Sequence, residues 1–321
     1  MSERKRLVTK CDIDGMTTGV LLKEMNLVED VLLCQAKDIE KGFVQITCND
    51  ITAGLPCRES AYLAFDHYSD QGGMGMNQRN HIVDTNCRST SRVVYNYFGH
   101  DRFNRVPREL LNVVDKVTCA DITLDDILYP SGWMLLSHLI DHRTALDRYT
   151  RFSLSTAMLM ETLIDWCREY TVWEVLSLPP IEERSTCYFA NVGAYKLQIM
   201  QCATVHKNLV IVDLRNKDIV YPGNRFMIYA LFPECNVSLQ IIPNHAGTKT
   251  TIAVGKSFLD RSLTVDIGKA MRECGGGGNR NAGACDVDND RVDIVVSNLI
   301  NTLQYGMFKN LFMGYYNYYY P

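Results

Sequence analysis

Over residues 7–149, short apolar runs alternate with stretches of helical periodicity. Residues 61–65 and 81–84 have the length and composition of strands, whereas residues 91–98 and 107–117 have the starting residues and spacing of helices. This alternation is typical of βαβ units, in which helices connect parallel strands. It predicts an α/β fold whose N-terminal domain is a parallel sheet with helices on both faces.

The second half of the chain has a different pattern. Strand-like runs and two helical stretches predict a smaller C-terminal mixed-sheet α/β domain; the strands are expected at 209–213, 226–229, 237–241 and 251–254, and the helices at 267–274 and 292–303. Pro179-Pro180, followed by charged residues, indicates a break in the chain. We therefore predict a catalytic domain over residues 1–178, a linker over 179–190 and a substrate-binding domain over 191–321.

A short run near the N-terminus, Val-Thr-Lys-Cys-Asp-Ile-Asp-Gly, ends at Gly15. A strand ending at Cys11 would place Asp12 and Asp14 at its carboxyl end, where open α/β sheets bind ligands. Carboxylate oxygens suit magnesium and manganese. Taken alone, the run is equally well explained as an ordinary loop.

Further acidic and histidine residues follow other strand-like segments: Asp50, Asp66, His67 and Asp121. If those segments are adjacent parallel strands, their side chains converge with Asp12 and Asp14 on a site for two divalent ions. Two such ions would clamp the attacking and leaving oxygens of a phosphoryl transfer and generate hydroxide at neutral pH. The alternative for Asp66 and His67 is a helix cap beside a surface histidine.

A glycine run, Gly275–Gly278, is followed by Asn279 and Arg280. Consecutive glycines let backbone amides approach an anion, and arginine grips phosphate in a fork. The alternative is a flexible surface loop. Other phosphate, calcium and nucleophile motifs fail, because Thr250 and Arg291 stand where glycines are required and no Gly-x-Ser-x-Gly sequence occurs.

Bulk properties exclude several classes of protein. The net charge of -4 provides no global positive field, so phosphate binding must be local and long duplex nucleic acid is not an expected partner. No apolar run spans a bilayer or forms a signal-peptide core. The 12 cysteines include no Cys-x-x-Cys pair, which predicts thiols in the cytoplasm rather than a zinc site.

In this order, the motifs resemble those of the DHH phosphoesterases, a family with a DHH domain and a DHH-associated C-terminal domain. Asp12-Ile13-Asp14-Gly15 resembles the first motif, Asp50 the second, Phe65-Asp66-His67-Tyr68 the DHH signature, Thr118-Cys119-Ala120-Asp121 the fourth motif and Gly276-Gly277-Gly278-Asn279 the C-terminal glycine loop. Pro130-Ser131-Gly132-Trp133 and Gly223-Asn224-Arg225-Phe226 are similar to a bacterial subset labelled exopolyphosphatase-related.

The resemblance implies a hydrolase that uses manganese or magnesium, with two ions in each active site. It implies that Asp12 holds one ion and Asp14 the other, that Asp50 bridges them, and that His67 and Asp121 complete the second site. Asp66 would orient the site from its edge. The implied substrate contacts are Lys10, Tyr68, Gly276, Gly277, Gly278, Asn279 and Arg280.

Three residues depart from the family pattern, because Lys10, Tyr68 and Asn279 stand where many members have histidine. We expect a phosphoesterase acting on a small nucleotide, a short oligonucleotide or polyphosphate, with hydrolysis by metal-activated water. The alternative is a degenerate binder of phosphorylated ligands with the same fold. A homodimer is possible, and the tyrosine-rich tail at 315–320 has no assigned role.

Overall fold

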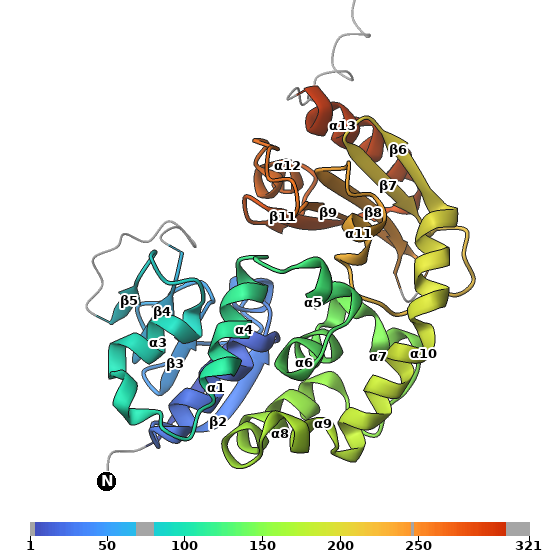
Figure 1. Ribbon diagram of the computed structural model, residues 1–321. Coiled ribbons are helices and arrows are strands. Elements are labelled where there is room, and N and C mark those ends of the chain that lie inside the picture. Colours follow the sequence, from blue (N-terminus) through green and yellow to red (C-terminus); the bar gives the residue numbers. More distant parts are fainter. Residues whose placement is uncertain (1–3, 69–79, 245–246, 306–321) are drawn as a thin grey trace, which may run out of the picture. The chain divides into compact units, whose positions relative to one another are not determined.

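The computed structural model describes residues 4–68, 80–244 and 247–305 (Figure 1). The chain divides into two compact units. The first comprises Met1–Ala190 with Pro222–Asn224, and the second comprises Asn191–Tyr221 with Arg225–Pro321. The tyrosine-rich tail lies outside the described residues.

A five-stranded sheet forms the centre of the first unit, with strand order β2-β1-β3-β4-β5. Every neighbouring pair is parallel, so the carboxyl ends of all strands meet at one edge. The strands are β1 (Lys5–Lys10), β2 (Val28–Cys34), β3 (Asp50–Ala53), β4 (Leu63–Asp66) and β5 (His81–Val83).

Helices cover both faces of this sheet. Leu7 and Val8 are both fully buried although successive strand residues point to opposite faces. Val8 packs with Ile39 of α2 (Ala36–Glu40), whereas α1 (Ile13–Glu24) contacts β1 and β2. The other helices of this unit are α3 (Thr90–Phe98), α4 (Arg108–Thr118), α5 (Leu124–Leu128), α6 (Gly132–Ile140), α7 (Leu146–Tyr149), α8 (Thr156–Glu169) and α9 (Val172–Leu176), with short 3-10 turns η1 (His100–Arg102) and η2 (His142–Thr144).

Helix starts follow from capping residues. Asp12 caps α1 by accepting a hydrogen bond from the Gly15 amide, and Ser89 caps α3 by accepting one from the Arg92 amide. Within α1, Gly19 allows close packing on α8, since a β-carbon there would lie 2.7 Å from Cδ1 of Ile164.

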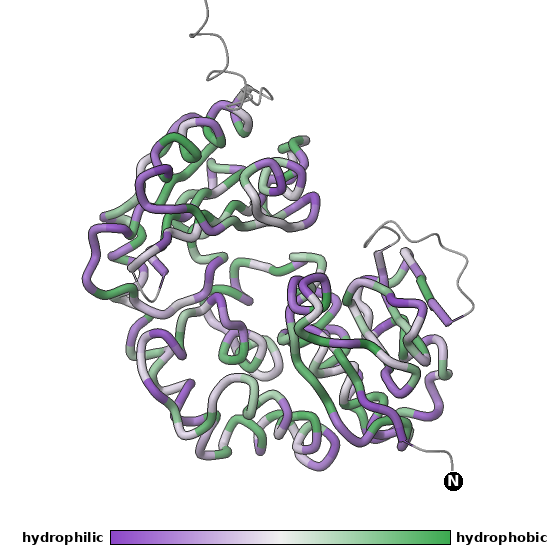
Figure 2. Tube along the Cα trace, turned by 180° about the vertical axis from the view of Figure 1, so that it is seen from behind, coloured by the Kyte–Doolittle hydropathy of each residue, from purple (hydrophilic) through white to green (hydrophobic). Residues whose placement is uncertain are grey.

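The second unit contains a six-stranded mixed sheet with order β10-β11-β9-β8-β7-β6. Only β7 and β8 pair in parallel; the other neighbouring strands are antiparallel. The elements are β6 (Ala203–His206), β7 (Leu209–Asp213), α11 (Met227–Leu231), β8 (Val237–Pro243), β9 (Lys249–Lys256), α12 (Ile267–Glu273), β10 (Gly277–Gly278), β11 (Ala282–Asp288), η3 (Asn289–Arg291) and α13 (Val292–Tyr305). Apolar residues of the strands, α12 and α13 share one buried core, and Figure 2 shows hydrophobic colour along these strands.

Residues 179–190, predicted as a linker, begin the 24-residue helix α10 (Pro179–Cys202), because proline is tolerated in the first turn of a helix. This helix crosses the division of the chain after Ala190. The strand expected at 226–229 is wrong, because Phe226 caps helix α11 and residues 227–229 belong to it. In the described part of the chain, no helix is both long and apolar enough to cross a membrane.

Candidate active site

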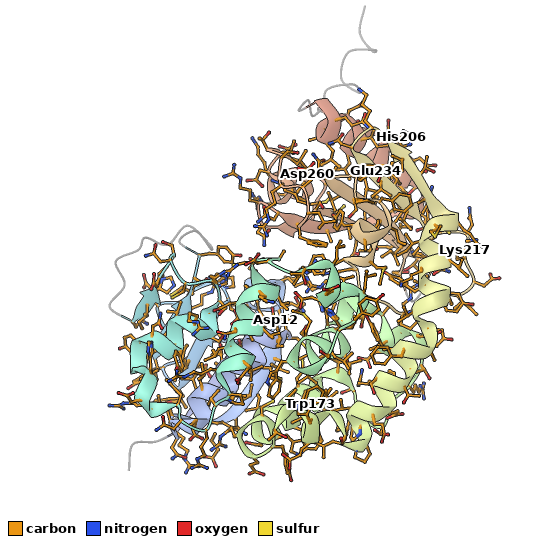
Figure 3. The ribbon with its side chains drawn as sticks, viewed as in Figure 1. Asp12, Trp173, His206, Lys217, Glu234 and Asp260 are labelled. Atoms are coloured by element: carbon orange, nitrogen blue, oxygen red, sulfur yellow. The ribbon has the colours of Figure 1, made fainter. Side chains whose placement is uncertain are left out.

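The first motif lies at the carboxyl edge of the parallel sheet. β1 ends at Lys10, and Asp12 and Asp14 stand at the start of α1, which follows directly. Asp12 is labelled within the first unit in Figure 3. Burial raises the pKa of Asp12, the positive charges of Lys10 and Arg143 oppose this rise, and the negative charge of Asp14 adds to it. Asp12 is therefore influenced by one neighbouring carboxylate and by two neighbouring cations.

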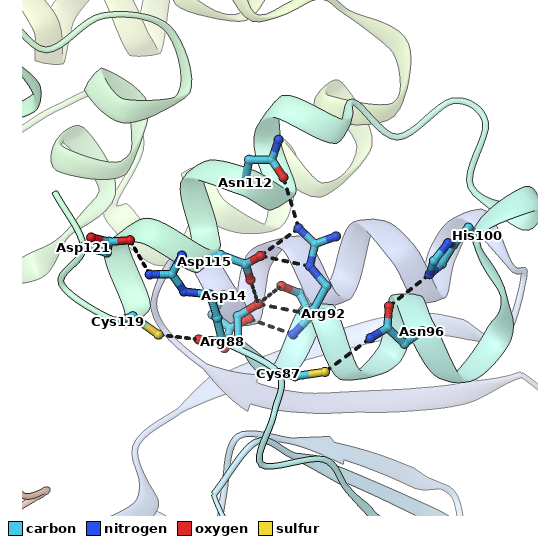
Figure 4. A network of polar contacts seen from close by, with 12 residues as sticks. Asp14, Cys87, Arg88, Arg92, Asn96, His100, Asn112, Asp115, Cys119 and Asp121 are labelled. Atoms are coloured by element: carbon cyan, nitrogen blue, oxygen red, sulfur yellow. Dashed lines mark hydrogen bonds and ion pairs between the residues drawn. The ribbon is translucent and has the colours of Figure 1, made fainter.

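Asp14 is anchored to the beginning of α3. Its Oδ2 accepts a hydrogen bond from the Thr90 amide at 2.9 Å, and its Oδ1 accepts one from the Ser91 amide at 2.8 Å. These amides belong to the first turn of the helix, which stabilises a negative charge. Figure 4 shows this contact next to the Arg92–Asp115 ion pair, which ties α3 to α4.

His67 lies beside these carboxylates and is 6% exposed. Its Nδ1 lies 2.9 Å from Oγ1 of Thr90, and among the described residues its buried Nε2 has no hydrogen-bond partner. Burial lowers the pKa of His67, although Asp14 and Asp66 oppose the shift, so the imidazole is neutral at neutral pH. If Nδ1 donates to Thr90, then Nε2 presents a lone pair.

Asp66 and Tyr68 flank the histidine. The buried carboxylate of Asp66 accepts a hydrogen bond from the Tyr68 amide at 3.0 Å, and burial raises its pKa. The ring of Tyr68 is 4.0 Å from that of His67, centroid to centroid. Burial raises the pKa of Tyr68, and Cys119, Asp66 and Asp14 add to the rise.

The structure separates Asp50 from this cluster. Asp50 is the first residue of β3 and pairs in register with Arg6, so it lies at the amino edge of the sheet. Arg6 Nε donates to its Oδ1 at 2.7 Å, and the Thr47 amide donates to its Oδ2 at 2.7 Å. The expectation that a strand ends before Asp50 is wrong, because the strand begins there.

A hollow of about 370 Å³ lies at that same amino edge. Its lining mixes both signs of charge: Arg4, Lys5, Arg6, Glu29, Asp30, Thr47, Asn49 and Asp50. Arg6 is already paired with Asp50 there, and none of the residues around His67 contributes. We therefore do not assign the active site to this hollow.

Asp121 follows a helix rather than a strand. It comes after α4, and its carboxylate pairs with Arg88 at 2.5 Å, as Figure 4 shows. Its side chain is 56% exposed. In the described part of the chain, no three His, Cys, Asp or Glu side chains are placed to hold a metal ion.

The glycine run forms a tight hairpin in the second unit. The amides of Gly275, Gly276 and Asn279 donate to protein carbonyls, so they do not point at an anion. Gly276 is required because a β-carbon there would lie 2.1 Å from the carbonyl oxygen of Ala284. These three amides are therefore not available to an anion, and the substrate contacts expected of Gly277 and Gly278 stay a prediction.

Side chains, rather than amides, supply positive charge near this hairpin. Oδ1 of Asn279 accepts from the amides of Asn281 and Ala282, so it shapes the turn. Burial lowers the pKa of Lys256, and the charge of exposed Arg280 lowers it further. Lys256 at the end of β9 and Arg280 are thus neighbouring cations.

The chain is similar over nearly its whole length to a solved phosphodiesterase. The pGpG-specific phosphodiesterase PggH from Vibrio cholerae is 38% identical, with 94% of this chain and 99% of that chain covered and a TM-score of 0.78. The chain belongs to the DHH phosphoesterase family. It is therefore an enzyme of the DHH type. The exopolyphosphatase-related label remains a prediction.

A distant member supports the fold of this DHH enzyme. RecJ from Thermus thermophilus, solved with Mn²⁺, is 13% identical and has a TM-score of 0.51, with 92% of this chain and 51% of that chain covered. At this identity the likeness concerns the fold alone. No family model and no curated protein sequence matches the chain.

Two residues that the structure places in the candidate site were not predicted from the sequence. Arg143 in η2 lies near Asp12 and is held by Asp141 through hydrogen bonds of 2.7 Å. In the sequence, the only feature that points to Arg143 is the charged triplet at 141–143, which follows the apolar helix α6. The second is Thr90, which contacts His67 and stands one residue before the helix expected at 91–98.

Proposed function

We propose that this DHH enzyme hydrolyses the phosphodiester of a short guanine-containing dinucleotide such as pGpG. The observation that carries the proposal is the near full-length similarity to a phosphodiesterase with that specificity. The cluster around His67 supports it, because acidic, imidazole and cationic groups gather at the carboxyl edge of the sheet, where α/β folds bind ligands. The proposal places the reaction in the cytoplasm, since all twelve cysteines are thiols.

The proposed reaction consumes one water. The water oxygen bonds to phosphorus, the bond from phosphorus to the ribose oxygen breaks, and that oxygen takes a proton. A dinucleotide thus yields two mononucleotides. Lys10 and Arg143 place positive charge near Asp12, where it favours binding of the phosphodiester.

The residues present fit a divalent ion on the side of His67. The orphaned Nε2 of this buried, neutral imidazole is suited to ligate a cation, and Thr90 fixes the ring from the other nitrogen. We propose that His67 and Asp14 would hold manganese or magnesium together with oxygens of water and substrate, because no third His, Cys, Asp or Glu side chain of the described residues is placed to join them. When bound, such an ion lowers the pKa of its water and polarises phosphoryl oxygen.

A hydrolysis screen with manganese tests the proposal. Purified chain is given pGpG, a cyclic dinucleotide, phosphoadenosine phosphate and polyphosphate, and products are separated by chromatography. We expect turnover of pGpG in preference to the others, and a loss of at least about 100-fold in kcat/KM for His67→Ala, as for removal of a metal ligand or its support.

The matched control is His206→Ala, which removes an exposed histidine of the second unit, labelled in Figure 3. This variant should keep full activity. Absence of turnover with every substrate would favour the alternative of a phosphate-binding protein. Undiminished activity of a folded His67→Ala variant would remove His67 from the site.

A further inference from the structure

Lys10 lies at the middle of the carboxyl edge of the parallel sheet. In register, Thr9 of β1 pairs with Ala53 of β3, and Ala53 pairs with Phe65 of β4. One step further along the three strands stand Lys10, Gly54 and Asp66. The residue that directly follows the central strand β3, Gly54, thus has no side chain.

The side chains of Lys10 and Thr90 together fill the place that Gly54 leaves open. A β-carbon built on Gly54 would lie 3.2 Å from Oγ1 of Thr90 and 3.5 Å from both Nζ and Cε of Lys10. The ammonium therefore lies over the end of β3, between the strands that carry the acidic residues. There it lowers the pKa of both Asp12 and Asp66, although burial dominates and raises both.

No carboxylate from β3 reaches this place. The only acidic residue of β3 is Asp50, which lies at the opposite end of the strand and is bound to Arg6 and Thr47. A hard divalent cation needs several oxygen ligands. Here it would meet a fixed positive charge and lack the oxygen ligands that a side chain from β3 would offer.

We propose that the Lys10 ammonium takes the place of a second metal ion, so that the site binds one divalent ion, beside His67, instead of two. The inference rests on the proposed function only for that one ion. Lysine presents a compact charge with three donors, which suits the non-bridging oxygens of a phosphate. The ammonium stabilises negative charge and takes no part in bond breaking.

Metal stoichiometry tests the inference without measuring activity. The full chain is titrated with Mn²⁺ by calorimetry, and the bound ions are counted by native mass spectrometry. We expect one ion per chain. In Lys10→Met the count stays at one, but the dissociation constant falls roughly tenfold, because a unit charge within about 6 Å of a divalent ion repels it on that scale even in water.

Two further variants sharpen the test. Lys37→Met removes an exposed lysine of α2 and should bind Mn²⁺ as the unaltered chain does. Lys10→His combined with Gly54→Asp supplies two ligands where the ammonium lay, and should bind a second ion. Aspartate is among the residues that tolerate the left-handed backbone of Gly54, whose φ is +62°.

Several results would overturn the inference: two ions, or none, on the unaltered chain; an unchanged dissociation constant in Lys10→Met; or a single ion on the folded double variant. Circular dichroism shows whether the double variant folds. If it does not fold, the dissociation constant of Lys10→Met decides the inference. Two bound ions with intact pGpG hydrolysis would overturn this inference and leave the proposed function standing. One bound ion without pGpG hydrolysis would leave this inference standing and overturn the proposed function.

Discussion

At the scale of the residue, each aspartate of the motifs is defined by its partners. Asp14 bonds two amides of a helix start, Asp50 bonds an arginine and a threonine, and Asp121 bonds an arginine. Only the first of these arrangements leaves the carboxylate beside the buried imidazole of His67. Whether an aspartate of the motifs lies beside His67 therefore depends more on its position on the sheet than on its residue type.

We expect Asp50→Asn to lower stability without altering metal binding. Burial acts to raise the pKa of Asp50, but hydrogen bonds from Arg6 and Thr47 prevail and lower the pKa. The loss should be about 2 kcal/mol, as for hydrogen bonds to a charged group. Asp30→Asn, at an exposed neighbouring position, should change stability by less than about 0.5 kcal/mol.

The pH dependence follows from the lowered pKa. The stabilisation by ionised Asp50 is complete above the pKa of the unfolded chain, about 3.9, and is lost as pH falls through the folded pKa. Near pH 7, chemical denaturation should show a constant difference in the free energy of unfolding between the unaltered chain and Asp50→Asn. This difference should disappear below about pH 4. A variant that loses Mn²⁺ instead would return Asp50 to the metal site.

Part of the site could be predicted from the sequence. Asp12, Asp14, Asp66 and His67 follow short apolar runs that become β1 and β4, so their shared edge follows from parallel pairing. Asp50 could not be placed, because a strand that begins at an acidic residue and one that ends before it look alike without pairing partners. Arg143 comes from a turn distant in sequence, where only tertiary packing determines proximity.

At the scale of the element, the arrangement of the first unit depends on close helix contacts as much as on hydropathy. Strands and helices with clear periodicity, such as β7, α4 and α13, were predicted correctly apart from their ends. The short apolar run at 226–229 was not, because periodicity cannot distinguish a short buried helix from a strand. The register of α1 against α8 is likewise invisible in sequence, since it depends on Gly19 meeting Ile164.

We expect Gly19→Ala to destabilise the protein by about 1–2 kcal/mol, because overpacking against buried Ile164 outweighs the better helix propensity of alanine. Ile164→Val removes the atom that lies 2.7 Å from the new β-carbon. The double variant should therefore lose about 1 kcal/mol less than the sum of the single losses.

Gly193→Ala is the matched control in helix α10, because a β-carbon added there would meet no atom within 4 Å. It should stabilise the protein by roughly 0.5–1 kcal/mol. Thermal or urea unfolding measures all four variants. Additive losses at Gly19 and Ile164 would show that the two helices do not pack as described.

At the scale of the whole molecule, the net charge of -4 opposes an anionic substrate. The attraction of such a substrate must then come from cationic side chains close to where it binds, and each unit has a pair of neighbouring cations. In the first unit Lys10 and Arg143 lie near Asp12, and in the second Lys256 and Arg280 are neighbours.

If Lys256 and Arg280 bind substrate phosphate, Arg280→Ala and Lys256→Ala should each raise KM for pGpG about tenfold with little change in kcat, because the lost charge would serve binding and not bond breaking. The increase should shrink as salt is added. Lys249→Ala, at the other end of β9, should leave KM unchanged, since that lysine is paired with Asp288. A fall in kcat alone would argue against a binding role.

The assignment of Pro222–Asn224 to the first unit gives the chain an interlaced order. The polypeptide leaves the first unit after Ala190, returns to it for these three residues, and leaves again at Arg225. During the return, the Gly223 amide donates to the Thr144 carbonyl at 2.9 Å, and Asn224 Nδ2 lies 3.1 Å from His138 Nε2. A gene fragment ending at residue 190 would therefore encode a first unit without these three residues and their two contacts, so a single cut in the gene does not separate the two units.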